Sequence, residues 1–339
     1  MVTIKQISFL EHQQPTIERM YSLMGEALLF QTNDQGLAAA AEDAFAHYPS
    51  VQNGNRPPLV LQLFVKPASS SIPVDQQGPW STPTYCTQQH LLFISLGMEN
   101  TLVADLDQGY AFGILSSQLA RERDFVRHTF IEAASLAMLG LARQFVAIHA
   151  ACVSKNGVSV LLQGPSGTGK STLSYACLKR GFQILSEDVV QVKVTARKLN
   201  LWGMPRRVLL LPETADYFPE LSNWQTRQLI NGEWKLIIDV DHHFPGQALF
   251  QAQPNILVQL KRSPEGCVRL EKCTSTDADA VLEFIWSWEK PLDKNLICAL
   301  RQHLQQPFYN LYLNDNPDEA VDLLENEWSF FTTNNLPTA

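Results

Sequence analysis

The feature that most constrains this chain is an octapeptide that matches the phosphate-loop pattern GxxxxGKS/T at every fixed position, Gly164-Pro165-Ser166-Gly167-Thr168-Gly169-Lys170-Ser171. The residues before it, 158–163, form a short apolar stretch typical of a strand. The residues after it, 171–180, carry apolar side chains at helical spacing. The pattern therefore predicts a strand, a tight loop and a helix in immediate succession.

A loop of this kind binds the phosphates of a nucleotide. Its glycines let backbone N–H groups point inward, and the new helix offers its positive end to the same anion. We expect Lys170 to reach the β- and γ-phosphates and Ser171 to ligate Mg²⁺ through its hydroxyl. The predicted cofactors are ATP and Mg²⁺, and the predicted nucleotide-binding residues are Gly164, Pro165, Ser166, Gly167, Thr168, Gly169, Lys170, Ser171 and Thr172. The alternative is a glycine-rich connector that fits the pattern by chance.

Length and composition bound the remaining possibilities. At 339 residues, of which 45% are hydrophobic and 18% charged, the chain is long enough for two domains. The net charge of −8 and the lack of a lysine- or arginine-rich run disfavour a nucleic-acid partner. Six scattered cysteines without a CxxC pair indicate reduced thiols, and the longest apolar region, 133–142, is too short to span a bilayer. We therefore expect a cytoplasmic protein without a membrane partner.

Residues 1–116 are predicted to form a smaller N-terminal α+β domain for recognition of a substrate or partner. A helix is expected at 16–42, and residues 66–85, with four prolines, are expected to form a surface loop. Alternating or apolar stretches predict an antiparallel sheet from strands at 59–65, 91–96, 102–106 and 110–115.

Residues 117–330 are predicted to form the nucleotide-binding domain. A helix at 117–145 leads into it, and Asn156-Gly157 predicts a hairpin between strands at 148–153 and 158–162. The strand that feeds the phosphate loop should therefore have an antiparallel neighbour. Further strands are expected at 182–185, 207–211, 236–240, 256–261, 268–273 and 309–313, with helices from 276, at 295–305 and at 317–324.

Ser186-Glu187-Asp188 follows the strand expected after the loop helix, where an α/β sheet presents carboxylates to a ligand. A carboxylate at this place can hold Mg²⁺ or accept the proton of an attacking hydroxyl. The alternative is an acidic turn that only closes the strand.

Four segments together resemble the catalytic domain of the HPr kinase/phosphorylase family: His149-Ala150-Ala151, GPSGTGKSTL, Lys179-Arg180-Gly181-Phe182 and Ser186-Glu187-Asp188. The resemblance covers about 45 residues without gaps and continues more weakly to about residue 325. It implies an α/β fold with a mixed-sheet P-loop domain, HPr kinase/PEP carboxykinase-like, preceded by the smaller α+β domain.

The resemblance also implies roles for single residues. Asp188 would be the base that deprotonates an acceptor hydroxyl, His149 a second catalytic group beside it, and Lys170 a phosphate ligand. Ser171, Glu187 and Asp188 would hold the metal. The implied activity is an ATP-dependent kinase that transfers the γ-phosphate to a hydroxyl of a small molecule or to a serine of a peptide or protein. A homo-oligomer is compatible with the family, whose HPr-specific enzymes are hexamers.

The chain also departs from the family. Glu187-Asp188 stands where the family commonly has two aspartates. The glycine-rich signature of the HPr-specific enzymes is absent from 201–207, which reads LWGMPRR. HPr is therefore not the expected substrate, and the phosphorylase reaction stays open, as does the choice of Glu187 or Glu213 for the missing carboxylate. Arg206 and Arg207 are candidate phosphate or substrate contacts or a solvated turn pair. These departures keep an alternative function open: a nucleotide-binding regulator or slow NTP hydrolase whose N-terminal domain binds a partner.

Overall fold

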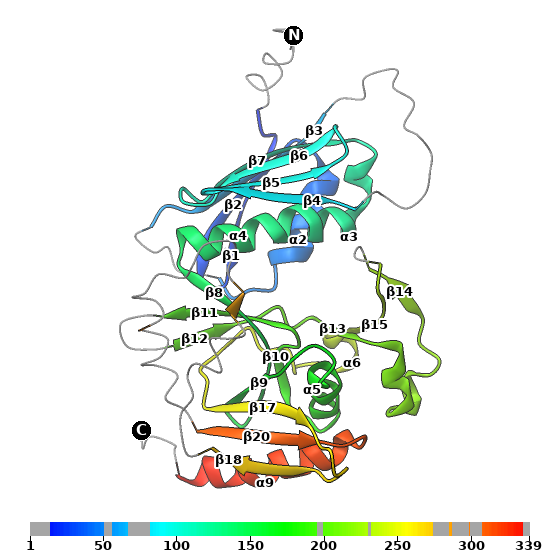
Figure 1. Ribbon diagram of the computed structural model, residues 1–339. Helices are drawn as coiled ribbons and strands as arrows, with labels where there is room; N and C mark the ends of the chain where they lie inside the picture. The colour runs from blue at the N-terminus through cyan, green and yellow to red at the C-terminus, as the bar shows by residue number, and fades with distance from the viewer. Residues whose placement is uncertain are drawn as a thin grey trace. The chain divides into compact units, whose positions relative to one another are not determined.

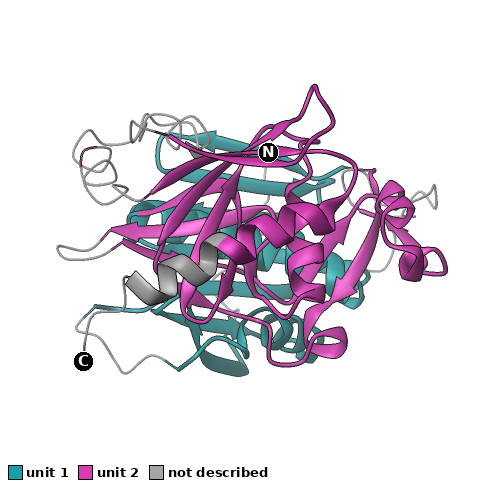
Figure 2. Cartoon of the chain, turned by 90° about the horizontal axis from the view of Figure 1, so that it is seen from below, with its two compact units in different colours: residues 1–144 teal, residues 145–339 magenta. Residues whose placement is uncertain are grey.

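The computed structural model describes residues 14–50, 56–66, 82–194, 199–229, 232–273, 285–286, 298 and 307–334 (Figure 1). The chain divides into two compact units, residues 1–144 and 145–339 (Figure 2). The division falls later than the expected boundary after residue 116. The reason is that the helical segment before Phe145 packs on elements of the first unit, namely α2, β3 and β6.

The first unit contains a seven-stranded sheet in the order β1-β2-β3-β7-β6-β5-β4. Strand β3 pairs in parallel with both β2 and β7, so the sheet is mixed. The prediction of an antiparallel sheet is therefore wrong for these strand pairs. The four strands expected from the sequence are present. The strands are β1 (Ile17–Leu23), β2 (Glu26–Thr32), β3 (Leu59–Lys66), β4 (Thr84–Gln88), β5 (Leu91–Leu96), β6 (Asn100–Asp105) and β7 (Tyr110–Ser116).

The helix expected at 16–42 is wrong over most of its length. Strands β1 and β2 occupy its first part, joined by a turn in which Met24 and Gly25 have φ of 50° and 80°. Glycine adopts this left-handed conformation readily, and a helix does not continue through it. Burial alternates along β2, as in a strand with one face on a core. Only α2 (Gln35–Phe45) is helical, and Asp34 caps it by accepting a hydrogen bond from the Leu37 N–H.

A continuous helical run ends the first unit. After the short η2 (Leu119–Arg121) it comprises α3 (Arg123–Val126), the π-helical η3 (Arg127–Glu132) and α4 (Ala133–Ala142). The stretch Arg123–Ala142 has the length and mean hydropathy, 1.2, of a membrane span, but 56% of it is buried inside the structure. That burial is typical of a core helix, because α4 packs on β3 and β6.

The second unit is built on a ten-stranded mixed sheet, whose main path is β16-β12-β11-β8-β9-β17-β20-β18, with β10 and β19 also paired to β8. The expected hairpin is confirmed, since β8 runs antiparallel to β9. β9, β17 and β20 are mutually parallel. The strands are β8 (Phe145–Lys155), β9 (Val158–Gln163), β10 (Gln183–Ser186), β11 (Val189–Val194), β12 (Leu199–Trp202), β16 (Gln251–Ala252), β17 (Ile256–Arg262), β18 (Arg269–Lys272), β19 (Ile285–Trp286) and β20 (Phe308–Leu313).

A second, three-stranded sheet consists of β13 (Arg207–Leu210), β15 (Trp234–Asp239) and β14 (Thr226–Gln228). Within the described residues, the other helices are α5 (Lys170–Lys179), η4 (Pro212–Asp216), η5 (Pro219–Leu221), α6 (Val240–His243) and α9 (Pro317–Asn334). The helices expected from 276 and at 295–305 lie outside the described residues, apart from single positions.

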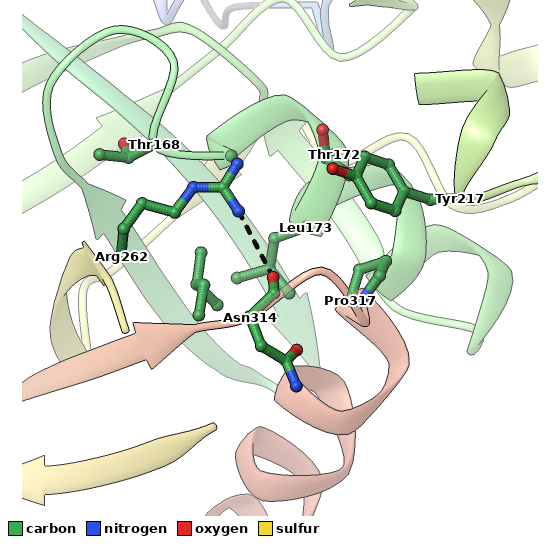
Figure 3. Close-up of a pocket in the computed structure, with 9 residues that line it drawn as sticks. Thr168, Thr172, Leu173, Tyr217, Arg262, Asn314 and Pro317 are labelled. Atoms are coloured by element: carbon green, nitrogen blue, oxygen red, sulfur yellow. Dashed lines mark hydrogen bonds between the residues drawn. The ribbon is translucent and has the colours of Figure 1, made fainter. Parts of the chain in front are cut away.

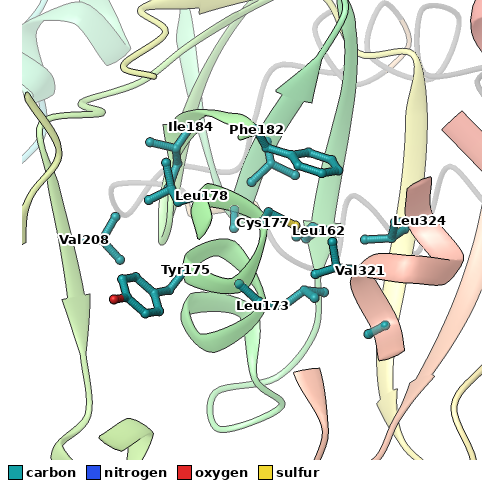
Figure 4. Close-up of a cluster of buried hydrophobic side chains, with 14 of the residues drawn as sticks. Leu162, Leu173, Tyr175, Cys177, Leu178, Phe182, Ile184, Val208, Val321 and Leu324 are labelled. Atoms are coloured by element: carbon teal, nitrogen blue, oxygen red, sulfur yellow. The ribbon is translucent and has the colours of Figure 1, made fainter. Parts of the chain in front are cut away.

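A buried apolar cluster fixes α5 beside the sheet (Figure 4). Leu173 and Cys177 of α5 belong to it, together with Leu162 of β9 and Val321 of α9. Each of these side chains is at most 1% exposed. The cluster holds the start of α5 directly after the carboxyl end of β9, which is the arrangement that the phosphate loop requires. The predicted α/β class with a mixed sheet is confirmed.

Candidate functional site

The phosphate loop connects the end of β9 to the first residue of α5, Lys170. Gly169, immediately before the helix, has a φ of 107°, a backbone conformation that residues with a Cβ rarely adopt. The Lys170 Nζ donates hydrogen bonds to the carbonyl oxygens of Gly164, at 2.7 Å, and Pro165, at 3.2 Å. The lysine thus lies within its own loop and is only 6% exposed.

Burial lowers the pKa of Lys170, while the nearby carboxylates of Asp188 and Glu187 act in the opposite direction. The two carboxylates come to this place because β10 pairs antiparallel to β8, as β9 does. β9 and β10 therefore run in the same direction and end at the same edge of the sheet. Open α/β sheets bind ligands at this edge.

Ser171 and Glu187 are in direct contact. The Ser171 hydroxyl donates to Glu187 Oε2 at 2.6 Å, and the backbone N–H of Leu209 in β13 donates to Glu187 Oε1 at 3.1 Å. Burial raises the pKa of the Glu187 carboxyl to about 7, and the two hydrogen bonds oppose this rise. A buried carboxylate beside a hydroxyl is thus held at the end of the phosphate loop.

These atoms suit a magnesium ion that is bound together with phosphate. Mg²⁺ takes oxygen ligands and is commonly held by one or two carboxylates together with substrate phosphates. Ser171 and Glu187 supply a hydroxyl and a carboxylate in contact with each other. No group of three His, Cys, Asp or Glu side chains within the described part of the chain is arranged to hold a metal by itself. The donor set therefore fits a metal that arrives with a nucleotide.

His149 of β8 forms a pair with Asp188, which lies in the turn directly before β11. His149 Nε2 lies 2.9 Å from Asp188 Oδ1, with side chains 35% and 59% exposed. The register places Val189 opposite His149, so Asp188 emerges directly beside the histidine. The Ser186 hydroxyl accepts from the Val189 N–H and donates to the Val189 carbonyl, which fixes the turn that carries Asp188. A carboxylate only accepts hydrogen bonds, so Nε2 carries the proton in this contact.

The candidate cations lie on or next to the three-stranded sheet. Arg206 pairs with Asp241 at 2.7 Å, and Arg207 stands opposite Asp239 in the β13–β15 register. Lys235 of β15 pairs with Glu233 at 3.3 Å, and its charge also acts on Glu187. The described ion pair of Arg206 is thus with α6, whereas Arg207 and Asp239 are neighbours in strand register.

Glu213, the other candidate carboxylate, and the neighbouring histidines His242 and His243 have no described contact with this centre. Glu213 is exposed in η4, and no described contact joins it to Ser171 or Asp188. His242 and His243 stack on each other, and His243 also stacks on Trp224, with ring centroids 4.5 Å apart.

Two features at or near this site could not be predicted from the sequence: a backbone hydrogen bond to Glu187 and the close packing of a glycine on β10. The Leu209 N–H acts through its backbone, which no side-chain pattern reveals. Gly203 lies so close to the end of β10 that a Cβ built on it would be 1.9 Å from the Leu185 carbonyl oxygen. In the sequence, the only sign of this close packing is that a glycine occurs in the stretch LWGMPRR, which differs from the family's signature.

Comparisons with known proteins find relatives over part of the chain. No protein-family model matches the chain. An HPr kinase/phosphorylase of Streptococcus thermophilus is 38% identical over 63 residues, which are 19% of this chain and 20% of that protein. One of Streptococcus pyogenes is 31% identical over 96 residues, 28% of this chain and 29% of that protein. One of an Exiguobacterium species is 34% identical over 67 residues, 20% of this chain and 22% of that protein.

Each of these alignments spans less than a third of the relative's length. The solved structure of the Hpr(Ser) kinase/phosphatase from Coxiella burnetii aligns with a TM-score of 0.31 and 18% identity, over 55% of this chain and 98% of that one. Over these segments of 63 to 96 residues, at 31 to 38% identity, the chain is similar to HPr kinase/phosphorylases.

Proposed function

We propose that this protein is an ATP-dependent kinase that transfers the γ-phosphate of ATP to a hydroxyl group of a small molecule or to a serine of a peptide or protein. The observation that carries the proposal is the His149–Asp188 pair, which lies at the same sheet edge as the phosphate loop. A nucleotide-binding loop alone does not select a reaction. A half-exposed carboxylate beside it supplies the base that phosphoryl transfer to a hydroxyl uses.

In this proposal Lys170 leaves the carbonyl groups of Gly164 and Pro165 to contact the β- and γ-phosphates. Its ammonium then compensates phosphate charge that the loop N–H groups also stabilise. Ser171 and Glu187 would hold Mg²⁺, with Asp188 as a further candidate ligand; the ion supplies positive charge to the phosphate oxygens.

Asp188 would accept the proton of the acceptor hydroxyl as its oxygen bonds to the γ-phosphorus. The bond between that phosphorus and the β–γ bridging oxygen breaks, and ADP leaves. His149 holds the Asp188 carboxylate by donating from Nε2. This hydrogen bond would orient the carboxylate, so that its other oxygen faces the hydroxyl.

The test is transfer from γ-labelled ATP with Mg²⁺ into pooled metabolites and peptides of a bacterial extract, analysed by mass spectrometry. We expect the wild-type protein to produce a labelled species that is absent with Lys170→Ala and with Asp188→Asn. Asp216→Asn, an exposed aspartate of η4, is the matched control and should behave like the wild type.

The competing function is a nucleotide-binding regulator or slow NTP hydrolase. It is supported by Glu187 in place of the family's aspartate and by the departing stretch 201–207. It predicts that only ADP and free phosphate appear, whatever extract is offered. It also predicts that Asp188→Asn changes the turnover little.

A further inference from the structure

The first unit contains a groove beside β1, which is an edge strand of the seven-stranded sheet. The volume of the groove is about 470 Å³, within the range of about 300 to 1,000 Å³ that is common for ligand sites. The hollow beside Thr172 and Tyr217 near the phosphate loop (Figure 3), by contrast, has about 30 Å³, which is room for only a few water molecules. Of the two, only the groove at β1 is large enough for a sizeable ligand.

The groove runs along the backbone edge of β1. Five consecutive residues of this strand, 18–22, line it. Successive side chains of a strand point to opposite faces of the sheet, so only a hollow along the edge of the strand meets all of them. At about 3.3 Å per residue, this edge is about 16 Å long. The opposite wall consists of Glu42 and Phe45 at the end of α2 and of Tyr48 beyond it.

The turn between β1 and β2 fixes which residues of β1 are hydrogen-bonded to β2. Met24 and Gly25 have φ of 50° and 80°, and positive values at both central residues are typical of a type I′ turn. In such a turn the carbonyl of the first residue, here Leu23, accepts from the N–H of the fourth, Glu26. These two residues are also register partners in the sheet. Leu23 is therefore directed towards β2.

The backbone N–H and C=O groups of Glu18, Met20 and Ser22 are directed the other way, towards the groove. The reason is that residues along an antiparallel strand alternate between those that bond to the neighbour and those that do not, counted here from Leu23. Within the described part of the chain, β1 pairs with β2 alone, and no described hydrogen bond occupies these outward backbone groups. Unpaired backbone groups at a sheet edge are a template for another strand.

Ser22 provides a second, independent sign of a ligand in the groove. It lines the groove and is 8% exposed, and its hydroxyl is buried with no hydrogen-bond partner among the described residues. Buried polar atoms in native proteins nearly always have a partner. A ligand that carries its own N–H and C=O groups into the groove would supply one.

The charges at the groove favour a basic ligand. Of the charged side chains that line it, Glu18 and Glu42 are acidic and Arg19 is basic. Glu42 Oε2 accepts from the Tyr21 hydroxyl at 2.9 Å, and the rings of Tyr21 and Phe45 lie 5.6 Å apart. A lysine or arginine can pack its aliphatic part on such rings and place its charge at the carboxylate.

We propose that the groove binds an extended, basic peptide segment of a partner protein, which adds as a further strand to β1 and pairs with Glu18, Met20 and Ser22. A single extended chain has no wall of its own and can reach the whole edge. The β1 edge of a second copy of this chain would bring its own α2 wall against the first. The inference goes beyond the proposed kinase activity and does not depend on it.

The test begins with selection of a phage-displayed library of random peptides on the full chain, without nucleotide. The most enriched peptide is then synthesised with a fluorescent label, and its affinity is measured by fluorescence polarisation. We expect the enriched peptides to contain lysine or arginine. Met20→Pro should weaken binding at least about tenfold, because proline removes an outward N–H, which an edge strand tolerates. Met20→Ala, the matched control, keeps that N–H and should bind within about threefold of the wild type.

A second measurement uses the wild-type protein and therefore holds even if Met20→Pro does not fold. Single backbone nitrogens of the selected peptide are methylated, one at a time. Every second methylation should weaken binding at least about tenfold, because alternate N–H groups of an added strand face β1. The methylations between them should change the affinity little.

Three results would each overturn the inference: no enriched peptide, equal affinities of Met20→Pro and Met20→Ala, or methylation effects without a two-residue period. A wild-type dimer in light scattering that Met20→Pro converts to a monomer would also overturn it, since the edge would then belong to a second copy. Because binding is measured without nucleotide, none of these results bears on the proposed kinase activity.

Discussion

Replacement of Glu187 by glutamine should remove a pH-dependent loss of stability. Glu187 is 8% exposed, accepts hydrogen bonds from Ser171 and Leu209, and has its pKa raised by burial from 4.5 to about 7. Glutamine has the shape of the protonated glutamic acid. Its oxygen can accept from the Leu209 N–H, and its amide can donate to the Ser171 hydroxyl.

The sign follows from proton binding. Between pH 4.5 and about 7 the folded protein binds a proton at Glu187 more tightly than the unfolded chain does, so stability falls as the pH rises. Each pH unit of difference corresponds to about 1.4 kcal/mol, which gives about 3 kcal/mol over the whole interval. Above about pH 7 the carboxylate is ionised in both states, and the loss is complete.

The assay is urea unfolding of the nucleotide-free and magnesium-free protein from pH 5 to pH 8. The free energy of unfolding of Glu187→Gln minus that of the wild type should increase by about 2 to 3 kcal/mol across this range, which covers most of the interval. Glu213→Gln, at an exposed position, should show a constant difference from the wild type. A constant difference for Glu187→Gln as well would refute the reasoning that the buried carboxyl titrates near neutral pH.

Three further predictions concern the loop, the base and the close glycine. Asp188→Asn should abolish phosphoryl transfer while ATP affinity stays within a few-fold, because only the proton acceptor is lost; turnover like that of the wild type would exclude Asp188 as the base. Lys170→Ala should weaken ATP binding at least tenfold in calorimetry, since its cation faces the phosphates; an unchanged affinity would exclude the loop as the phosphate site. Gly203→Ala should destabilise the protein by about 2 kcal/mol or more in chemical unfolding, because its Cβ would lie 1.9 Å from the Leu185 carbonyl oxygen. The control for it is Gly157→Ala, a turn glycine with open space around it and a φ of 80°, for which about 1 kcal/mol is expected; equal losses would contradict the close approach at Gly203.

Local signals in the sequence predicted the elements closest to the phosphate loop. The hairpin at Asn156-Gly157 and the helix after Lys170 need only neighbouring residues, namely left-handed turn positions and apolar side chains at helical spacing. The segment 16–42 shows the limit of such signals. Its apolar residues suit a helix as well as strands, and the paired strands β1 and β2 exist because β2 also pairs with the distant β3.

In the candidate site, too, the sequence indicated the residues, whereas their contacts depend on the tertiary structure. The resemblance singled out His149 and Asp188, and their contact depends on the register between β8 and β11. Their catalytic and binding roles stay predictions until the experiments above are carried out.

The sequence by itself determined the phosphate loop, its flanking strand and helix, and the candidate acids and bases, because short-range backbone preferences and side-chain chemistry specify them. Only the tertiary structure decided that Glu187 is buried against Ser171 and that Asp188 stands beside His149. These properties depend on strand order, strand register and exclusion of water. All three arise from contacts between residues that are distant along the chain.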